Sequence, residues 1–217
     1  MNRKNIFRFI ILILGLFFVV KKIYNSAEYS NIKKINKSYY SGEFIKAKSE
    51  LELHLKEYPK SSESWAYLGL VNLELDDTIN AELAYKKSYQ LDKKNDKTLI
   101  GLGIVNRMKK NYDSARFYYN KAIKFNANNP DVYSSLLILE LKNKNYNKAV
   151  ELGEKAWAMK NKNTRPGVLG NLIIAYHYNN QLERRDEALI ELENLNYKDI
   201  EYIKMAINGK VDLIDFL

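Results

Sequence analysis

Residues 62–95 read SESWAYLGLVNLELDDTINAELAYKKSYQLDKKN, and this stretch of 34 residues decides the fold because its pattern occurs four times. An alanine recurs at a strict interval of 34 residues, at Ala47, Ala81, Ala115 and Ala149. Larger side chains keep the same period, with Trp65, Leu99 and Tyr133 at position 4 of successive copies and Leu68, Leu102 and Leu136 at position 7. Such self-similarity predicts an array of structural repeats, with copies at 28–61, 62–95, 96–129 and 130–163.

Each copy is predicted to be a pair of helices. Apolar residues recur at spacings of three and four in both halves of a copy, which favours amphipathic helices over strands. Turn-forming pairs separate the halves, at Ser41-Gly42, Asp76-Asp77, Lys110-Asn111 and Lys144-Asn145. Small residues at positions 8 and 20 let the paired helices approach to roughly 8–10 Å. Leu137 at position 8 and Gly153 at position 24 are exceptions to this pattern of sizes.

The pattern loosens after residue 163. We expect a degenerate last repeat at 164–197, in which Arg185 takes the place of the small residue, unless Ala188 does so after a short insertion. Terminal repeats commonly depart from the pattern because one of their faces has no neighbour. A capping helix is predicted at 199–208, ended by Gly209, and the apolar tail at 211–217 is expected to fold back on this cap rather than to bind a partner.

The spacing resembles that of the tetratricopeptide repeat family, whose 34-residue unit is a helix-turn-helix with a large residue at position 4, Leu-Gly at positions 7 and 8, and Ala at position 20. Copy 62–95 matches best, through Trp65, Leu68, Gly69 and Ala81. The resemblance covers residues 28–163 without insertion and continues more loosely to about 197. It implies an all-α superhelical solenoid of four to five repeats plus a C-terminal capping helix.

The first residues are of a different kind. Residues 1–22 carry five basic residues and no acid, around an unbroken apolar run at 9–20. This run is short for a membrane span and typical of a signal-peptide core. Flanking apolar residues extend it, so a helix over 6–24 would cover about 28 Å, close to the roughly 30 Å of a bilayer core. No small-x-small cleavage site follows the run.

We therefore expect a signal-anchor or transmembrane helix at 1–24 ahead of a repeat domain at 25–217. A cleaved signal and a peripheral helix are the alternatives. Basic residues flank both sides of the apolar run, so the positive-inside rule gives a divided answer on orientation. A short basic start followed by a hydrophobic run resembles an export signal. This favours a single-pass protein of the bacterial inner membrane with an exported repeat domain, and the alternative is a domain that faces the cytoplasm.

Composition argues against nucleic acid and catalysis. The formal net charge is +9, and residues 1–22 supply +5 of it, which leaves +4 (9 − 5 = 4), mostly scattered lysine, without a dense basic stripe. The chain has no cysteine, and its two histidines, His54 and His177, lie far apart without further ligands at metal-binding spacing. Asp76-Asp77 is read as a helix-capping turn rather than a cation site. We predict no catalytic residue, no metal, no cofactor and no small-molecule substrate.

The resemblance places function in a concave surface lined by the first helices of successive repeats. The family's groove positions fall here on ten residues: Tyr67, Leu70, Leu73, Ile100, Ile104, Arg107, Met108, Ser134, Ile138 and Leu141. Ser135 occupies a further such position. Some members of the family hold C-terminal carboxylates of chaperones with Lys and Asn at positions 5 and 9, where this chain has Ala66 and Leu70. The largely apolar lining instead suits an extended apolar peptide or an amphipathic helix.

The sequence thus predicts a non-catalytic, membrane-anchored scaffold or adaptor that holds a protein partner in its groove, in the assembly of an envelope complex. Several bacterial proteins of the resembled family share this layout of an anchor followed by repeats. A regulatory or assembly module facing the cytoplasm is the first alternative. An accessory subunit of an enzyme on another chain is the second.

Overall fold

A computed structural model describes residues 30–159 and 166–209. All regular structure in these ranges is helical, as the sequence predicts. The predicted membrane helix at 1–24 and the tail at 211–217 lie outside the described residues. Among the described helices, none combines the length and the apolar character that a membrane crossing needs. The chain divides after Leu91 into two compact units, which we call the N-terminal and the C-terminal unit and describe separately.

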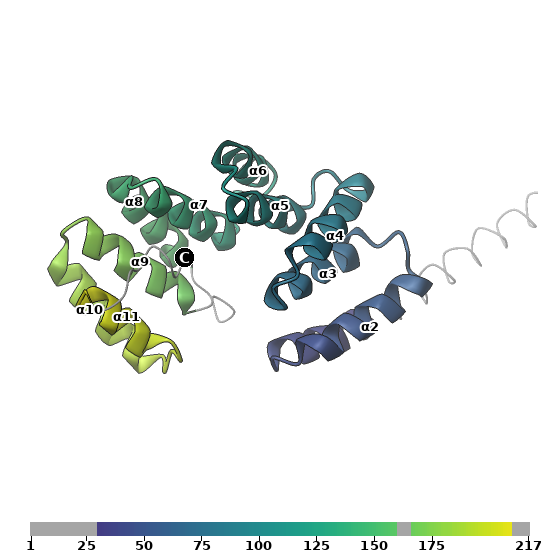
Figure 1. The fold of residues 1–217 in the computed structure, drawn as a ribbon, viewed down its shortest axis with the longest axis horizontal. Helices are drawn as coiled ribbons and strands as arrows, with labels where there is room; N and C mark the ends of the chain where they lie inside the picture. Colours follow the sequence, from purple (N-terminus) through teal and green to yellow (C-terminus); the bar gives the residue numbers. More distant parts are fainter. Residues whose placement is uncertain (1–29, 160–165, 210–217) are drawn as a thin grey trace, which may run out of the picture. The chain divides into compact units, whose positions relative to one another are not determined.

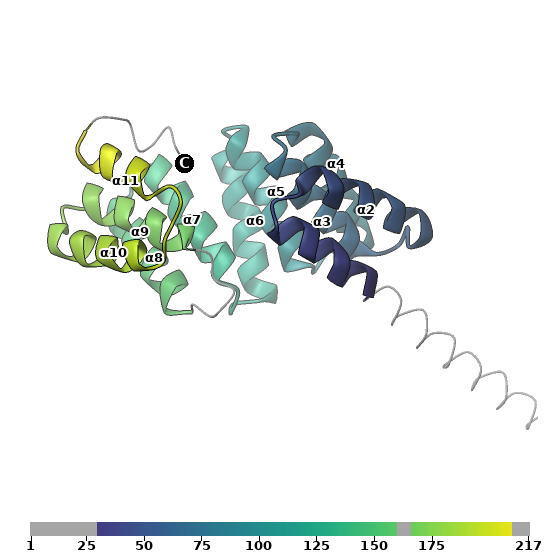
Figure 2. The same cartoon turned by 90° about the horizontal axis from the view of Figure 1, so that it is seen from below.

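In both units the helices come in hairpin pairs (Figures 1 and 2). The N-terminal unit contains a helix at 30–40, then α2 (Phe44–Glu57), α3 (Ser62–Glu74) and α4 (Thr78–Leu91). The C-terminal unit contains α5 (Asp96–Met108), α6 (Tyr112–Phe125), α7 (Pro130–Lys142), α8 (Tyr146–Ala158), α9 (Gly167–Tyr178), α10 (Leu182–Asn194) and α11 (Ile200–Ile207). We call the first helix of a pair the A helix (30–40, α3, α5, α7, α9) and the second the B helix (α2, α4, α6, α8, α10).

The A helices begin at N-caps that keep the 34-residue period. The side chains of Ser61, Asn95 and Asn129 accept hydrogen bonds from backbone N–H groups of the first turns of α3, α5 and α7. These caps satisfy N–H groups that have no partner within the helix. Pro130 follows its cap as the first residue of α7, where the missing N–H of proline costs nothing.

Each A helix ends in a left-handed residue that turns the chain into the B helix. Gly42, Asp76, Lys110 and Lys144 have φ between +57° and +75° and stand 34 residues apart, as the predicted turns require. The next N–H along the chain donates back over the turn, for example from Asn111 to the Asn106 carbonyl at 2.9 Å. This is the Schellman arrangement, which satisfies carbonyls at the end of a helix.

Within a pair, a small residue on one helix receives a large residue of the other. Position 8 on the A helix faces position 24 on the B helix, and we call this the 8/24 contact. A Cβ added to Gly69 or Gly103 would come closer than 3.0 Å to the ring of Tyr85 or Tyr119, respectively. In the first repeat two aliphatic side chains occupy these positions within the buried cluster.

The fourth repeat makes the 8/24 contact with the sizes exchanged. A Cβ on Gly153 would come closer than 3.0 Å to Leu137, so the small residue is on the B helix and the large one on the A helix. The two exceptions noted in the sequence are therefore the two halves of one contact. Because the sum of the two volumes is roughly kept, close packing is kept as well.

The other small position also behaves as predicted. The four alanines at position 20 are completely buried. Position 27 is buried in every repeat from the first to the fourth, including His54, whose ring stacks on Tyr58 with centroids 4.5 Å apart. His54 thus packs as a core side chain, in line with the structural role predicted for it.

The fifth repeat carries two extra residues. Its left-handed turn is at Asn180, 36 residues after Lys144 (180 − 144 = 36). Arg185 then stands three residues into α10, where Ala149 stands in α8, and Ala188, the other predicted residue, is buried three residues further on. The capping helix is present as α11, which packs on α9 through Ile203 and Gly170, and Gly209 follows it with φ +72°.

We expect Gly103→Ala to lower the free energy of unfolding by about 1–3 kcal/mol, because the new methyl group overpacks the 8/24 contact with Tyr119. Gly167→Ala is the matched control, since among the described residues its Cβ would meet only the Tyr197 hydroxyl oxygen at 3.5 Å. Alanine is also the better helix former, so the control should be unchanged or more stable. Urea midpoints measure both. Equal midpoints would show that position 8 does not set the helix spacing.

Candidate functional site

The predicted groove residues of the N-terminal unit lie on α3. Tyr67, Leu70 and Leu73 are all partly exposed. Tyr67 and Leu70 also pack against the buried cluster of this unit, which includes Ile35 on the preceding A helix and Leu51 on α2. The A-helix face of the N-terminal unit is therefore apolar, and part of each side chain is committed to the core.

The predicted groove residues of the C-terminal unit lie on α5 and α7, two A helices in contact with each other. Ile104 and Met108 of α5 and Ser134 and Ile138 of α7 keep part of their surface accessible, and Met108 is 46% exposed. Arg107 adds one partly exposed cation. We call these five residues the A-helix surface of the C-terminal unit.

Two predicted groove residues are core residues instead. Leu141 is 0% exposed and Ile100 is 7% exposed, so the structure corrects their assignment to the lining. Leu141 lies near the end of α7, on which both α8 and α9 pack, and Ile100 lies on α5, on which α6 and α7 pack. Ser135, at a further groove position, is also buried, and its hydroxyl donates to the Asp131 carbonyl.

A buried tyrosine connects the 8/24 contact to the A-helix surface. Burial raises the pKa of the Tyr119 hydroxyl, and the neighbouring Arg107 guanidinium and Ser135 hydroxyl offset this only in part. In the N-terminal unit burial likewise raises the pKa of Tyr85, and there the acid Glu74 acts in the same direction. Tyr119 therefore has a cation, Arg107, as its charged neighbour, whereas the equivalent Tyr85 has an acid, Glu74.

The buried carboxylate of Glu140 in the C-terminal unit is bonded to a neighbouring helix and is not a free acid. Glu140 on α7 is 3% exposed and accepts hydrogen bonds from the Arg116 guanidinium on α6 and, at 2.8 Å, from Asn145 Nδ2. Burial favours the neutral acid, but the bonds from Arg116 and Asn145 outweigh it and hold the pKa of Glu140 below its usual value. The ion pair ties the B helix of one repeat to the A helix of the next.

The equivalent place in the N-terminal unit has the acid and the amide exchanged. Asn72 occupies the position in the second repeat that Glu140 occupies in the fourth, and Asp77 likewise corresponds to Asn145. Lys48, the counterpart of Arg116, lies 3.6 Å from the Asp77 carboxylate. Asp77 also accepts from Asn80 at the start of α4, and these bonds lower its pKa. Asp77 is thus the capping residue that its turn position predicts.

The remaining histidine, His177, lies in the last helical turn of α9. Nδ1 of His177 lies 3.4 Å from an Arg185 nitrogen, and burial together with this cation lowers the pKa of the imidazole. Within the ranges that the structure describes, no group of three or more potential metal ligands comes together.

Paired helices in register, left-handed turns and the capping helix define the fold as a helical solenoid of tetratricopeptide repeat type. No family model matches the chain, and no curated protein matches its sequence. Solved structures do match. PilF from Pseudomonas aeruginosa is 19% identical, with 78% of this chain and 77% of that chain covered and a TM-score of 0.63.

Two further structures agree. A tetratricopeptide repeat protein from Parabacteroides merdae is 20% identical, with 81% of this chain and 68% of that chain covered and a TM-score of 0.66. The APC/C hetero-tetramer Cut9–Hcn1 gives a TM-score of 0.71 at 15% identity, over 78% of this chain and 34% of that chain. At these identities the likeness concerns the fold.

Glu140→Gln should destabilise the protein by about 1–3 kcal/mol at pH 7, because the amide keeps the shape of the side chain but loses its charge-assisted bonds. A depressed folded-state pKa stabilises above the unfolded value of about 4.3, and the effect is lost as the pH falls through the folded value. The difference between variant and parent should therefore shrink in acid.

Glu151→Gln is the control, since that carboxylate is exposed and, within the described ranges, pairs only with Lys148 one helical turn away. We expect about 0–1 kcal/mol for it. Urea unfolding between pH 3 and pH 7 measures all three proteins. A pH-independent difference for Glu140→Gln would show that the effect is one of packing.

Proposed function

We propose that this chain is a non-catalytic scaffold or adaptor that binds a protein partner, as a peptide or an amphipathic helix, on its A-helix faces. The observation that carries the proposal is the A-helix surface of the C-terminal unit. There Ile104, Met108 and Ile138 keep apolar area accessible on two adjacent helices. Other residues of α5 and α7 form the buried core, so these three side chains remain available to a partner.

The chemistry of this surface favours a partner with an apolar face. The five residues of this surface are three apolar side chains, one hydroxyl and one cation, Arg107, whose guanidinium lies beside the Tyr119 hydroxyl. An amphipathic helix presents side chains at intervals of three and four, which matches a shallow surface formed by two packed helices. In the N-terminal unit Leu70 and Leu73 offer the same kind of contact.

Known complexes with the same fold support this kind of partner. The Cut9–Hcn1 hetero-tetramer and Naa15/Naa10 bound to HypK-THB are both assemblies of proteins, and their likeness to this chain is one of fold. A protein surface as ligand also suits the lack of a metal cluster in the described residues and the engagement of Glu140 and His177 in internal contacts.

We further propose that residues 1–24 hold the scaffold at a membrane. The apolar run at 9–20 and the basic residues on both sides of it support this part of the proposal. The layout fits a bacterial inner-membrane protein whose repeats are exported and serve in the assembly of an envelope complex. Repeats that face the cytoplasm would instead serve as a regulatory or assembly module there, or beside an enzyme on another chain.

We expect Ile104→Asp to reduce partner binding by more than about 100-fold, because a carboxylate that faces an apolar ligand loses water without gaining a hydrogen-bond donor. A photo-crosslinking residue at position 104 of the full-length chain in native membranes should form an adduct, and mass spectrometry identifies the partner. Binding of that partner is then compared between Ile104→Asp and the parent.

Ile190→Asp is the matched control, because Ile190 is 60% exposed on the B helix α10 of the same unit. The same substitution there should leave binding unchanged, and both variants should keep the parent's helical spectrum. Adducts from position 190 and none from position 104 would move the site to the B helices.

The full-length chain should sediment with membranes and resist carbonate extraction, and a variant lacking residues 1–24 should be soluble. A mature chain that begins near Ser26 would instead indicate a cleaved signal. A phosphatase fused after Leu217 should be active if the repeats are exported. An inactive fusion favours the cytoplasmic module.

A further inference from the structure

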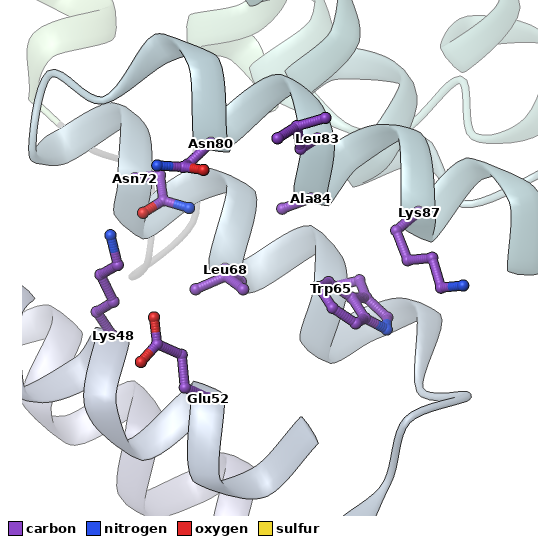
Figure 3. A pocket seen from close by; sticks show the side chains of 9 residues that line it. All are labelled: Lys48, Glu52, Trp65, Leu68, Asn72, Asn80, Leu83, Ala84 and Lys87. Carbon is purple, nitrogen blue, oxygen red and sulfur yellow. The ribbon is translucent and has the colours of Figure 1, made fainter. Parts of the chain in front are cut away.

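The N-terminal unit contains a pocket between its two B helices, α2 and α4. It is an open hollow of ≈ 370 Å³ between α2 and α4 with α3 as its floor (Figure 3). Its lining residues are Lys48, Glu52, Trp65, Leu68, Asn72, Asn80, Leu83, Ala84 and Lys87. We call it the α2–α4 pocket. The repeat pattern assigns it no role.

The two walls of the pocket carry opposite charges for which the described part of the chain supplies no partner. Glu52 projects into it from α2, and Lys87 stands on α4 (Figure 3). Neither makes an ion pair or a hydrogen bond with any residue in the described ranges. The third charged lining residue, Lys48, is already paired with Asp77. One acidic wall and one basic wall therefore remain uncompensated.

One large apolar side chain of the pocket lining is exposed, and others are exposed elsewhere on the two helices that form its walls. Leu83 lines it and is 60% exposed, and Ile79 stands one helical turn before Leu83 on α4 with 76% exposed. On α2, Leu53 is 68% exposed next to the lining residue Glu52, whereas Ile45, which is 75% exposed, lines a separate hollow at the start of that helix. Exposed apolar side chains that lie close together on a soluble protein often mark an interface.

We propose that the α2–α4 pocket is the interface through which two copies of this chain associate about a two-fold axis, with Glu52 of each copy facing Lys87 of the other. In such an interface the same patch meets itself, so a contact between two residues is made twice. The two-fold rotation brings the acidic α2 wall of one copy opposite the basic α4 wall of the second copy.

This self-complementarity is what selects a second copy as the occupant. A partner of one charge sign would place a like charge against one of the two walls, and juxtaposed like charges are unfavourable at interfaces. A second copy supplies both signs in the right order, and its exposed Leu83 provides the apolar group that the hollow above Leu68 and Ala84 can take up. The apolar contact supplies affinity and the charges fix the orientation.

Charge reversal tests the interface directly. Sedimentation velocity of the purified full-length chain, in a detergent density-matched to the buffer, should show a dimer that dissociates on dilution. Lys87→Glu and Glu52→Lys should each weaken the dimer by at least about tenfold, because each variant creates two like-charge contacts. The double variant Glu52→Lys/Lys87→Glu restores opposite charges across the interface and should regain most of the parent's affinity.

Lys93→Glu and Glu57→Lys are matched controls, since they reverse the same charges at exposed sites of the chain outside the pocket. They should dimerise like the parent. Leu83→Asp should abolish the dimer without changing the helical spectrum, because Leu83 is exposed in the single copy. A monomeric parent, a dimer insensitive to the pocket variants, or a double variant weaker than both single variants would each overturn the proposal.

Discussion

The 8/24 contact is the constraint on which the rest of the structure depends. In the second, third and fourth repeats it sets how closely an A helix and its B helix approach, because one of the two residues is small enough for the other to lie against backbone. Gly69, Gly103 and Gly153 each supply that space, the last from the opposite helix. Once the spacing within a pair is set, the neighbouring pair meets a defined surface. The A-helix faces can then carry side chains that the core does not need.

Most of the architecture could be predicted from the sequence because its causes are local and periodic. Turns, the alanines of position 20 and the capping helix follow from residue types at fixed intervals. The exchange of sizes between Leu137 and Gly153 could not be predicted from each repeat position taken alone, because it depends on positions 8 and 24 together, and these two positions meet only in the folded structure. A signal was present, because the interval between these two residues equals the interval between Gly103 and Tyr119.

The candidate site was predicted less well for a related reason. Groove positions taken from a repeat pattern treat every repeat alike, whereas burial depends on what packs on each helix. Leu141 is covered because α7 receives both α8 and α9, and its counterpart Leu73 on α3 stays partly exposed. The α2–α4 pocket was missed altogether, because the charges and apolar residues that define it lie on two helices and follow no common period.

The exchanged positions of acid and amide have a consequence for how this array can evolve. Asp77 in the N-terminal unit, and Glu140 bonded to Asn145 in the C-terminal unit, are two solutions to the same task of holding a cation of the preceding B helix. A duplicated or transplanted repeat would bring its own acid and amide but not the cation, which lies on the B helix of the preceding repeat. Placed behind the wrong neighbour, it could set two acids beside one cation or leave a cation facing amides alone. Repeats of one fold and one length are therefore not interchangeable here. The polar side chains, rather than the hydrophobic pattern, determine which repeat can follow which.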